Sequence, residues 1–282
     1  MKANDMGTID TAAADAAQRS ERGRREFADV MTFEPPADSS PTATSGLIDF
    51  VFAEVWTRPV LSRRDRRFVT LSCVADSDSE QDLVDHVYAA LNSGDITITE
   101  MRETVLHFAV YAGWPKASRF NIVVDIQWDR IHRERGLPLP PPEPLLPLVT
   151  PSDPEERLVQ GTATFKDINC MPFAPDRDNP YQGAGILNFV FGEMWVRPGL
   201  DMRARRLITV ACVGFQDAPL PILSHVYAAL KSRDISFEEM DELALQFGAY
   251  SGLPKAAYLG HVIGEQKARV LREWRDEAGT TS

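Results

Sequence analysis

An internal repeat is the feature that most constrains the fold of this chain. Residues 50–117 recur as residues 189–256 at a constant offset of 139, without insertion or deletion, and 34 of the 68 aligned positions are identical. This period is far longer than the roughly 20 to 50 residues of a solenoid unit, so each copy is a block of domain size. The sequence therefore predicts two similar domains in tandem.

Apolar residues within each copy recur every three or four positions, which is typical of helices that bury one face. Phe68, Leu71 and Val74 show this spacing. We therefore predict that both copies are all-α. The predicted helix boundaries are Ser62 and Asp201 as N-caps, Thr99 before Glu100, Gly94 as a C-cap, and Pro115 and Pro254 in first turns.

Composition divides the chain further. Residues 1–20 are rich in Ala, Asp and Thr and are predicted to form a flexible N-terminal tail. Eight prolines fall within residues 136–154, a composition that favours an extended, semi-rigid spacer. We expect a first domain over 21–136, a linker over 137–154 and a second domain over 155–282.

The net charge of −11 argues against a nucleic-acid partner, because phosphate binding requires clustered and uncompensated Lys and Arg. The Arg-rich segments 63–67 and 203–206 are local exceptions. Neither an apolar span of 18 residues nor a signal-peptide pattern is present. We expect a soluble, cytoplasmic protein with no membrane partner.

The cysteine pattern excludes several kinds of site. The three cysteines are an odd number and form no CxxC pair, and the five histidines have no HxxxH spacing. Cys73 and Cys212 occupy equivalent positions within apolar runs, so we expect them to be buried hydrophobic residues. No metal and no cofactor is predicted.

An ordered set of motifs recurs in both copies: E-x-W-x-R-P-x-L, an Arg-rich turn, H-x-x-A-A-L, and Y-x-G-x-P-x-A. The set runs from Glu193 to Ala256 in the second copy and from Glu54 to Ala117 in the first. It resembles the carboxymuconolactone decarboxylase family, whose domains share the all-α fold of the alkylhydroperoxidase D proteins. The resemblance implies two tandem domains of that fold.

The family has a peroxidase branch and a decarboxylase branch. The peroxidase branch resembles the pattern C-x-x-C-x-x-x-H, but this chain has Ser79 and Asp82 at the two thiol positions of the first copy, and Ala218 and Pro221 in the second. Without a thiolate nucleophile, cysteine-based peroxide reduction lacks its reacting atom. A thiol peroxidase is therefore disfavoured.

The decarboxylase branch keeps the histidine without the cysteines, and implies a cofactor-independent lyase acting on a small carboxylated lactone or related cyclic acid. A guanidinium holds a carboxylate with two hydrogen bonds, and an imidazole titrates near neutrality. Glutamate would hold or share the imidazole's proton. The candidate residues are His225, His86, Glu193 and Glu54 for the proton, and Arg197, Arg58, Arg205, Arg66, Trp195 and Trp56 for the substrate.

Each candidate also has a structural interpretation. A histidine on a helix is often a hydrogen-bonded core residue, and an arginine before proline often satisfies helix carbonyls. A Glu–Arg ion pair can be purely structural, with no role in catalysis. Two alternative functions stay open: an isomerase or cyclase using the same site on an enolisable metabolite, and a non-catalytic binding or scaffold protein. Arg67 and Arg206 stand where the resemblance implies a smaller or acidic residue.

The repeat also bears on assembly. Single-domain relatives commonly form rings of dimers, so the resemblance implies that the fused copies replace one dimer. We expect a homo-oligomer, namely a trimer of pseudo-dimers. The second copy matches the motif more closely, with Gly192 before Glu193 and Gly199 after the Arg-Pro pair. If one site works alone, we favour the second copy.

Overall fold

The computed structural model describes residues 4–37, 40–216 and 218–280, and every regular element within them is a helix. The all-α prediction is confirmed. The first half contains α1 (Asn4–Met31), the π-helix η1 (Thr42–Trp56), α2 (Arg63–Asp76), α3 (Glu80–Ser93), α4 (Ile98–Ala112) and α5 (Trp114–Glu134). The second half contains α6 (Pro154–Ile168), the π-helix η2 (Tyr181–Phe191), the 3₁₀-helix η3 (Met194–Val196), α7 (Met202–Phe215), α8 (Pro219–Lys231), α9 (Phe237–Ser251) and α10 (Leu253–Thr280).

The two halves have the same order of helices. Equivalent helices begin 139 residues apart, as α2 at Arg63 and α7 at Met202 show. One local difference separates them, because η1 continues to Trp56 whereas η2 ends at Phe191 and a short 3₁₀-helix follows. Glu193 lies at this break, with φ −131° and ψ −59°.

Side-chain caps set most helix ends as the sequence indicates. Ser62 accepts a hydrogen bond from the backbone of α2, and Asp201 does the same for α7. Gly94 ends α3 with φ 77°, which confirms its predicted role. The prediction of Thr99 was wrong. Thr97 is the N-cap instead, because its hydroxyl and the Glu100 carboxylate form a reciprocal capping box three residues apart.

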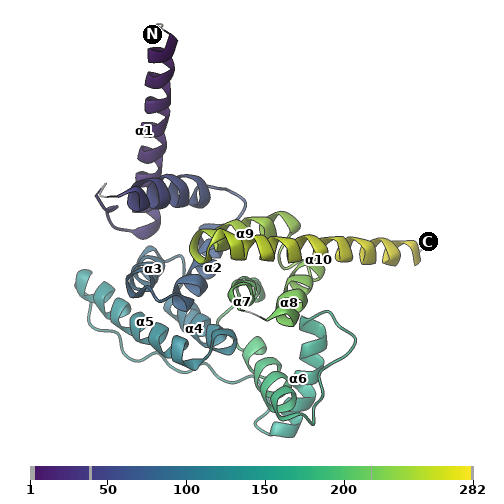
Figure 1. Ribbon diagram of the computed structural model, residues 1–282. Coiled ribbons are helices and arrows are strands. Elements are labelled where there is room, and N and C mark those ends of the chain that lie inside the picture. Colours follow the sequence, from purple (N-terminus) through teal and green to yellow (C-terminus); the bar gives the residue numbers. More distant parts are fainter. Residues whose placement is uncertain (1–3, 38–39, 217, 281–282) are drawn as a thin grey trace.

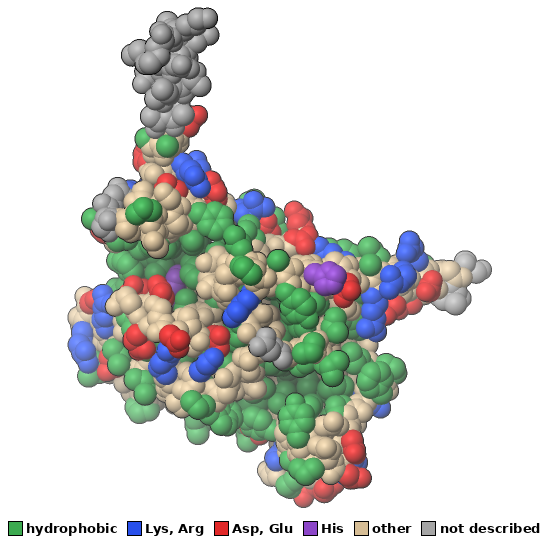
Figure 2. Space-filling model, in the orientation of Figure 1, with side chains coloured by type: hydrophobic (Ala, Val, Ile, Leu, Met, Phe, Trp, Pro, Cys, Tyr) green, Lys and Arg blue, Asp and Glu red, His purple; other side chains and the backbone are tan. Residues whose placement is uncertain are grey.

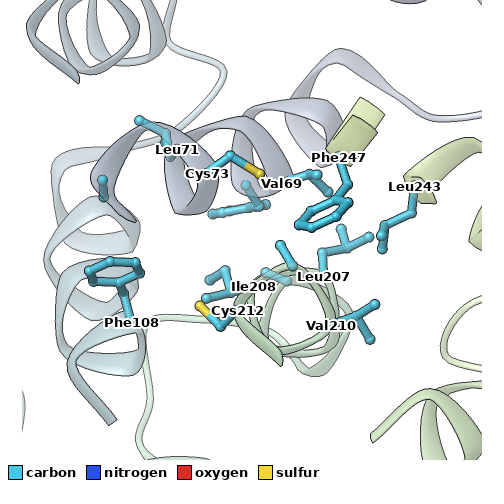
Figure 3. Packing of buried hydrophobic residues seen from close by; sticks show 14 of the residues in the cluster. Val69, Leu71, Cys73, Phe108, Leu207, Ile208, Val210, Cys212, Leu243 and Phe247 are labelled. Atoms are coloured by element: carbon cyan, nitrogen blue, oxygen red, sulfur yellow. The ribbon is translucent and has the colours of Figure 1, made fainter. Parts of the chain in front are cut away.

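Helices of the two halves interleave around a shared interior (Figure 1). The α1–η1 pair lies at one end of the molecule and α6 at the opposite end, with α2 and α7 between them. Figure 3 shows Leu71 and Cys73 of α2 packed with Ile208 and Cys212 of α7 and with Phe247 of α9. One continuous hydrophobic core therefore spans both sequence copies.

The two segments predicted to lie outside the domains, residues 1–20 and 137–154, differ in secondary structure. Within residues 1–20, expected as a tail, the helix α1 begins at Asn4 and continues past residue 20. The linker 137–154 has no helix before Pro154 and is fastened by an ion pair of 3.0 Å between Glu143 and Arg102. No helix in the described part of the chain is both long and apolar enough to cross a bilayer.

Candidate functional site

The first candidate site joins the end of η1 to helices of both copies. The Trp56 indole and the His86 imidazole are parallel to within 12°, with centroids 6.4 Å apart. Tyr250 of α9 meets His86 edge-on at 5.2 Å and accepts a hydrogen bond of 2.8 Å from Trp56 Nε1. A residue of the second copy thus completes the surroundings of the first copy's histidine.

The second candidate site repeats this arrangement with the copies exchanged. Trp195 and His225 are parallel to within 8° at 6.1 Å. Tyr111 of α4 meets His225 edge-on at 5.3 Å and accepts a hydrogen bond of 2.9 Å from Trp195 Nε1. Each site therefore contains residues of both halves, and neither half holds a complete site.

Both histidines are nearly enclosed by protein. His86 is 5% exposed and His225 is 7% exposed, and Nδ1 of each imidazole has no hydrogen-bond partner in the protein. Burial, followed by the positive charge of Arg67 or Arg206, lowers each pKa to about 3. Both imidazoles are therefore neutral at neutral pH.

The arginines of the Arg-Pro pairs are already paired with carboxylates of the opposite copy. Arg197 donates to Glu103 from Nε at 2.9 Å and from Nη2 at 2.8 Å. Arg58 donates to Glu242 from Nε at 2.8 Å and from Nη2 at 2.5 Å. These four side chains connect the two copies in the geometry that a guanidinium and a carboxylate prefer.

Arg66 and Arg205 also contribute to the contact between the two copies. Arg66 donates to the Arg58 carbonyl at 2.9 Å, to Gln246 at 2.9 Å and to Glu242 at 3.2 Å. Arg205 donates to the Arg197 carbonyl at 2.8 Å and lies 3.3 Å from His107 Nδ1. Burial lowers the Arg205 pKa to about 10. Both guanidiniums thus have structural partners.

The predicted glutamates face away from the imidazoles. Glu54 pairs with Arg19 of α1 at 2.8 Å, and Glu193 lies 3.8 Å from Arg197. Neither carboxylate has a hydrogen bond to His86 or His225 among the described residues. Glu54 lies within the π-helix η1, on the side that packs against α1, which explains its direction.

Sequence reasoning missed the carboxylates that do engage the arginines, Glu103 and Glu242. They occupy equivalent positions of the repeat and are identical, so the signal was present in the alignment of the two copies. Tyr111 and Tyr250 are likewise identical residues at equivalent positions of the repeat. Helix spacing alone does not indicate that these residues reach the opposite copy.

The two sites differ in enclosure. Arg58 is 48% exposed and Glu54 is 44% exposed, whereas Arg197 is 13% and Glu193 is 19% exposed. The linker contributes to this difference, because Leu146 packs beside Gly199 and Glu103. Arg197 and Glu193 of the second copy are consequently the better shielded from water, whereas the two histidines are buried to a similar degree.

The possible metal ligands and the two equivalent cysteines are distributed as follows. Among the described residues, no three side chains of His, Cys, Asp or Glu are grouped so that they suit a metal ion. Cys73 and Cys212 are buried, as predicted, and burial raises the Cys73 pKa to about 12. Such a thiol remains protonated at neutral pH and is a poor nucleophile.

Two surface depressions lie away from the histidines. One, of about 530 Å³, lies beside Tyr227 and Arg269, and the other, of about 520 Å³, lies beside Pro219 and Lys255. Figure 2 shows a further hollow between the α1–η1 pair and the body of the molecule, lined by hydrophobic side chains with histidine surface inside it. The candidate histidines therefore lie apart from both depressions.

Comparison with known proteins finds a family match within the first half of the chain. Residues 41–125 match the Carboxymuconolactone decarboxylase family. A 4-carboxymuconolactone decarboxylase of Acinetobacter baylyi is 38% identical over 69 residues, which cover 24% of this chain and 51% of that protein. A nitrosuccinic acid decarboxylase of Metarhizium robertsii is 36% identical over 77 residues, covering 27% of this chain and 53% of that protein. The chain thus spans about half the length of these curated relatives.

Proposed function

We propose that this chain is a cofactor-free carboxy-lyase acting on a small organic acid, because its residues 41–125 match the carboxymuconolactone decarboxylase family. Both relatives described above are named decarboxylases, of a lactone acid and of a nitro-substituted acid. What those names share is the loss of a carboxylate from a small organic acid. We extend that substrate class to this chain, with small carboxylated lactones and related cyclic acids as the leading candidates.

The observation that carries the proposal is a buried imidazole with a free Nδ1 against a tryptophan face, found in both copies. An unpartnered buried nitrogen costs roughly 1–3 kcal/mol. In a histidine with a purely structural role, this nitrogen normally has a hydrogen-bond partner. A histidine that receives a substrate needs this atom available.

The reaction has two stages, the loss of carbon dioxide and the protonation of carbon. The bond between the carboxylate carbon and its neighbour breaks, its electron pair moves into the conjugated acceptor, and carbon dioxide leaves. The resulting enolate then takes a proton at carbon. His225 is our candidate for handling that proton, and Trp195 provides the apolar wall that excludes water.

The low pKa of His225 shapes its role. In the free protein the imidazole carries no extra proton at neutral pH. A bound carboxylate would raise its pKa, because an opposite charge nearby favours the protonated form. The substrate itself would thus prepare the acid that later protonates carbon.

We assign the main activity to the second site. Its Arg197 and Glu193 are less exposed than Arg58 and Glu54, and electrostatic interactions are stronger where water is excluded. Arg206 supplies the positive charge that acts on His225, while Arg197 and Arg205 remain bound to their own partners. Glu193 would act through Arg197, which lies 3.8 Å from it.

Carbon dioxide release tests the proposal directly. We would assay 4-carboxymuconolactone and nitrosuccinate with wild type, His225→Gln, His86→Gln and the control His261→Gln, whose side chain is 68% exposed. We expect wild type and the control to release carbon dioxide from one of the acids and His225→Gln to lose at least about 100-fold in rate. Thermal unfolding of each variant checks that the fold is retained.

Two results would contradict the proposal. Conversion of an acid to a product of the same mass would indicate the isomerase instead. An absence of turnover for a wider set of small acids would favour the binding or scaffold protein. Equal rates for wild type and the folded His225→Gln variant would remove this histidine from the mechanism.

A further inference from the structure

The buried atoms without protein partners are not scattered at random. Two kinds of atom recur at equivalent positions of both copies. They are Nη1 of the arginine, in Arg67 and Arg206, and Nδ1 of the histidine, in His86 and His225. Arg66 Nε also lacks a partner, but the equivalent atom of Arg205 is not in this group. Only the Arg67/His86 and Arg206/His225 pairs therefore repeat with the site itself.

The two members of each pair lie around one indole ring. The Arg206 guanidinium carbon is 5.2 Å from the centre of Trp195, and the His225 imidazole lies parallel to that ring. In the first copy, the Arg67 guanidinium carbon is 5.5 Å from the centre of Trp56, to which His86 is parallel. The positive charge of each arginine also lowers the pKa of its histidine.

The rest of each guanidinium is held firmly. Arg206 donates from Nε to Asp234 at 3.0 Å and from Nη2 to the Ile168 carbonyl at 2.6 Å. Arg67 donates from Nε to Asp95 at 3.1 Å and from Nη2 to the Val30 carbonyl. These contacts fix the plane of the guanidinium and leave Nη1 as the donor not bound to protein.

We propose that Arg206 and His225 together bind one carboxylate group of an organic acid, and that Arg67 and His86 form the equivalent position of the first copy. The acid part of this inference rests on the proposed function. The arginines of the Arg-Pro pairs and their neighbours Arg66 and Arg205 are not the anchor, because Glu103, Glu242 and backbone carbonyls already occupy them.

The donor set explains the choice of a carboxylate. Nη1 of Arg206 donates, and His225 donates from Nδ1 whenever that nitrogen carries a proton, both in the neutral imidazole and in the protonated form that a bound carboxylate favours. In the proposed complex, the two oxygens of one carboxylate accept these two hydrogen bonds. A charge-assisted hydrogen bond from a buried guanidinium is strong, and the fixed plane lowers the entropic cost of binding.

Calorimetric titration with succinate tests the anchor in wild type, Arg206→Lys and Arg67→Lys. Lysine keeps the charge beside Asp234 or Asp95 but removes the planar Nη1 donor. The matched control is Arg233→Lys, since Arg233 also lies over a tryptophan, but over Trp274, 4.5 Å from its centre, and not over Trp56 or Trp195. We expect Arg206→Lys to weaken succinate binding about ten-fold or more, and Arg233→Lys to leave it unchanged.

A second measurement needs no arginine variant. In wild type with ¹⁵N-labelled histidine, the His225 Nδ1 signal, assigned by its loss in His225→Gln, should shift on adding succinate but not on adding neutral succinamide. A shift with neither compound would mean that the two groups bind water alone, which would overturn the inference. So would wild type that binds no succinate, or Arg206→Lys that binds it as tightly as wild type does.

These results are separable from the proposed function. Loss of succinate binding in Arg206→Lys, together with an absence of carbon dioxide release from any acid, would keep the anchor and reject the lyase. Carbon dioxide release with unchanged binding in Arg206→Lys would keep the lyase and reject the anchor.

Discussion

Arg197 of the second copy holds Glu103 of the first through two hydrogen bonds of 2.9 Å and 2.8 Å, with both side chains largely shielded from water. The equivalent pair, Arg58 and Glu242, has the same geometry but an arginine that is half exposed. One interaction thus occurs twice in a single chain under different degrees of exposure. This difference allows the effect of burial to be measured within one protein.

Replacing each arginine should destabilise the protein unequally. Arg197→Gln leaves Glu103 buried without its charged partner, and we expect a loss of about 3 kcal/mol in the free energy of unfolding. Arg58→Gln should cost about 1 kcal/mol or less, because Glu242 keeps Arg66 and water reaches the site. Urea unfolding of the two variants measures the difference. Equal losses would contradict it.

Acid should destabilise the protein through its buried histidines. His86 and His225 have a pKa of about 3 in the folded protein and an ordinary value of 6.5. Between these pH values the unfolded chain binds more protons, so stability falls as the pH decreases from 6.5 towards 3. Each histidine contributes a slope of up to about 1.4 kcal/mol per pH unit.

Urea midpoints between pH 8 and pH 5 measure this dependence. The His86→Gln/His225→Gln double variant should have a flatter pH profile than wild type, even if its stability at pH 8 is lower. The exposed His261 is the control, and His261→Gln should keep the slope of wild type. An unchanged slope in the double variant would show that these imidazoles accept protons freely in the folded state.

Gly199 should be less tolerant of alanine than Gly136. Both have a positive φ, of 88° and 65°, which alone costs a residue with a Cβ about 1–2 kcal/mol. A Cβ at Gly199 would also lie 2.6 Å from Leu146 of the linker and 3.1 Å from Glu103, whereas one at Gly136 meets nothing within 4 Å. Gly199→Ala should therefore be the less stable variant in urea.

The same change should loosen the linker. Because Leu146 must move to accommodate the new Cβ, we expect limited proteolysis within residues 137–154 to be faster in Gly199→Ala than in Gly136→Ala. Equal cleavage rates would show that the contact between Leu146 and Gly199 does not hold the linker in place.

The sequence predicted the helices better than it predicted their partners. Helical spacing and the N-caps Ser62 and Asp201 are local signals, and they were confirmed. Thr99 was a wrong N-cap because Thr97 also precedes Glu100 and forms the reciprocal bond at the correct spacing. Local chemistry therefore suffices for boundaries when one capping residue is present, and fails when two compete.

The candidate site was predictable only in part. The residues around each histidine include Trp56 and Trp195, which the sequence indicated, but also Tyr250 and Tyr111 from the opposite copy. Which helices meet across the core depends on three-dimensional packing, and spacing along the chain does not contain it. The path of the linker, which places Leu146 beside Gly199, depends on the same packing.

Each copy supplies the tyrosine that contacts the other copy's histidine, and this limits how the gene can evolve. A mutation of Tyr250 changes the second copy but alters the surroundings of His86 in the first. A mutation of Tyr111 likewise alters the surroundings of His225. Neither half can drift without altering the other half's histidine, so compensating changes must arise on both sides of the linker. Because the two copies differ in sequence, one site can nevertheless be refined while the other is relaxed, a freedom that a dimer of identical chains does not have.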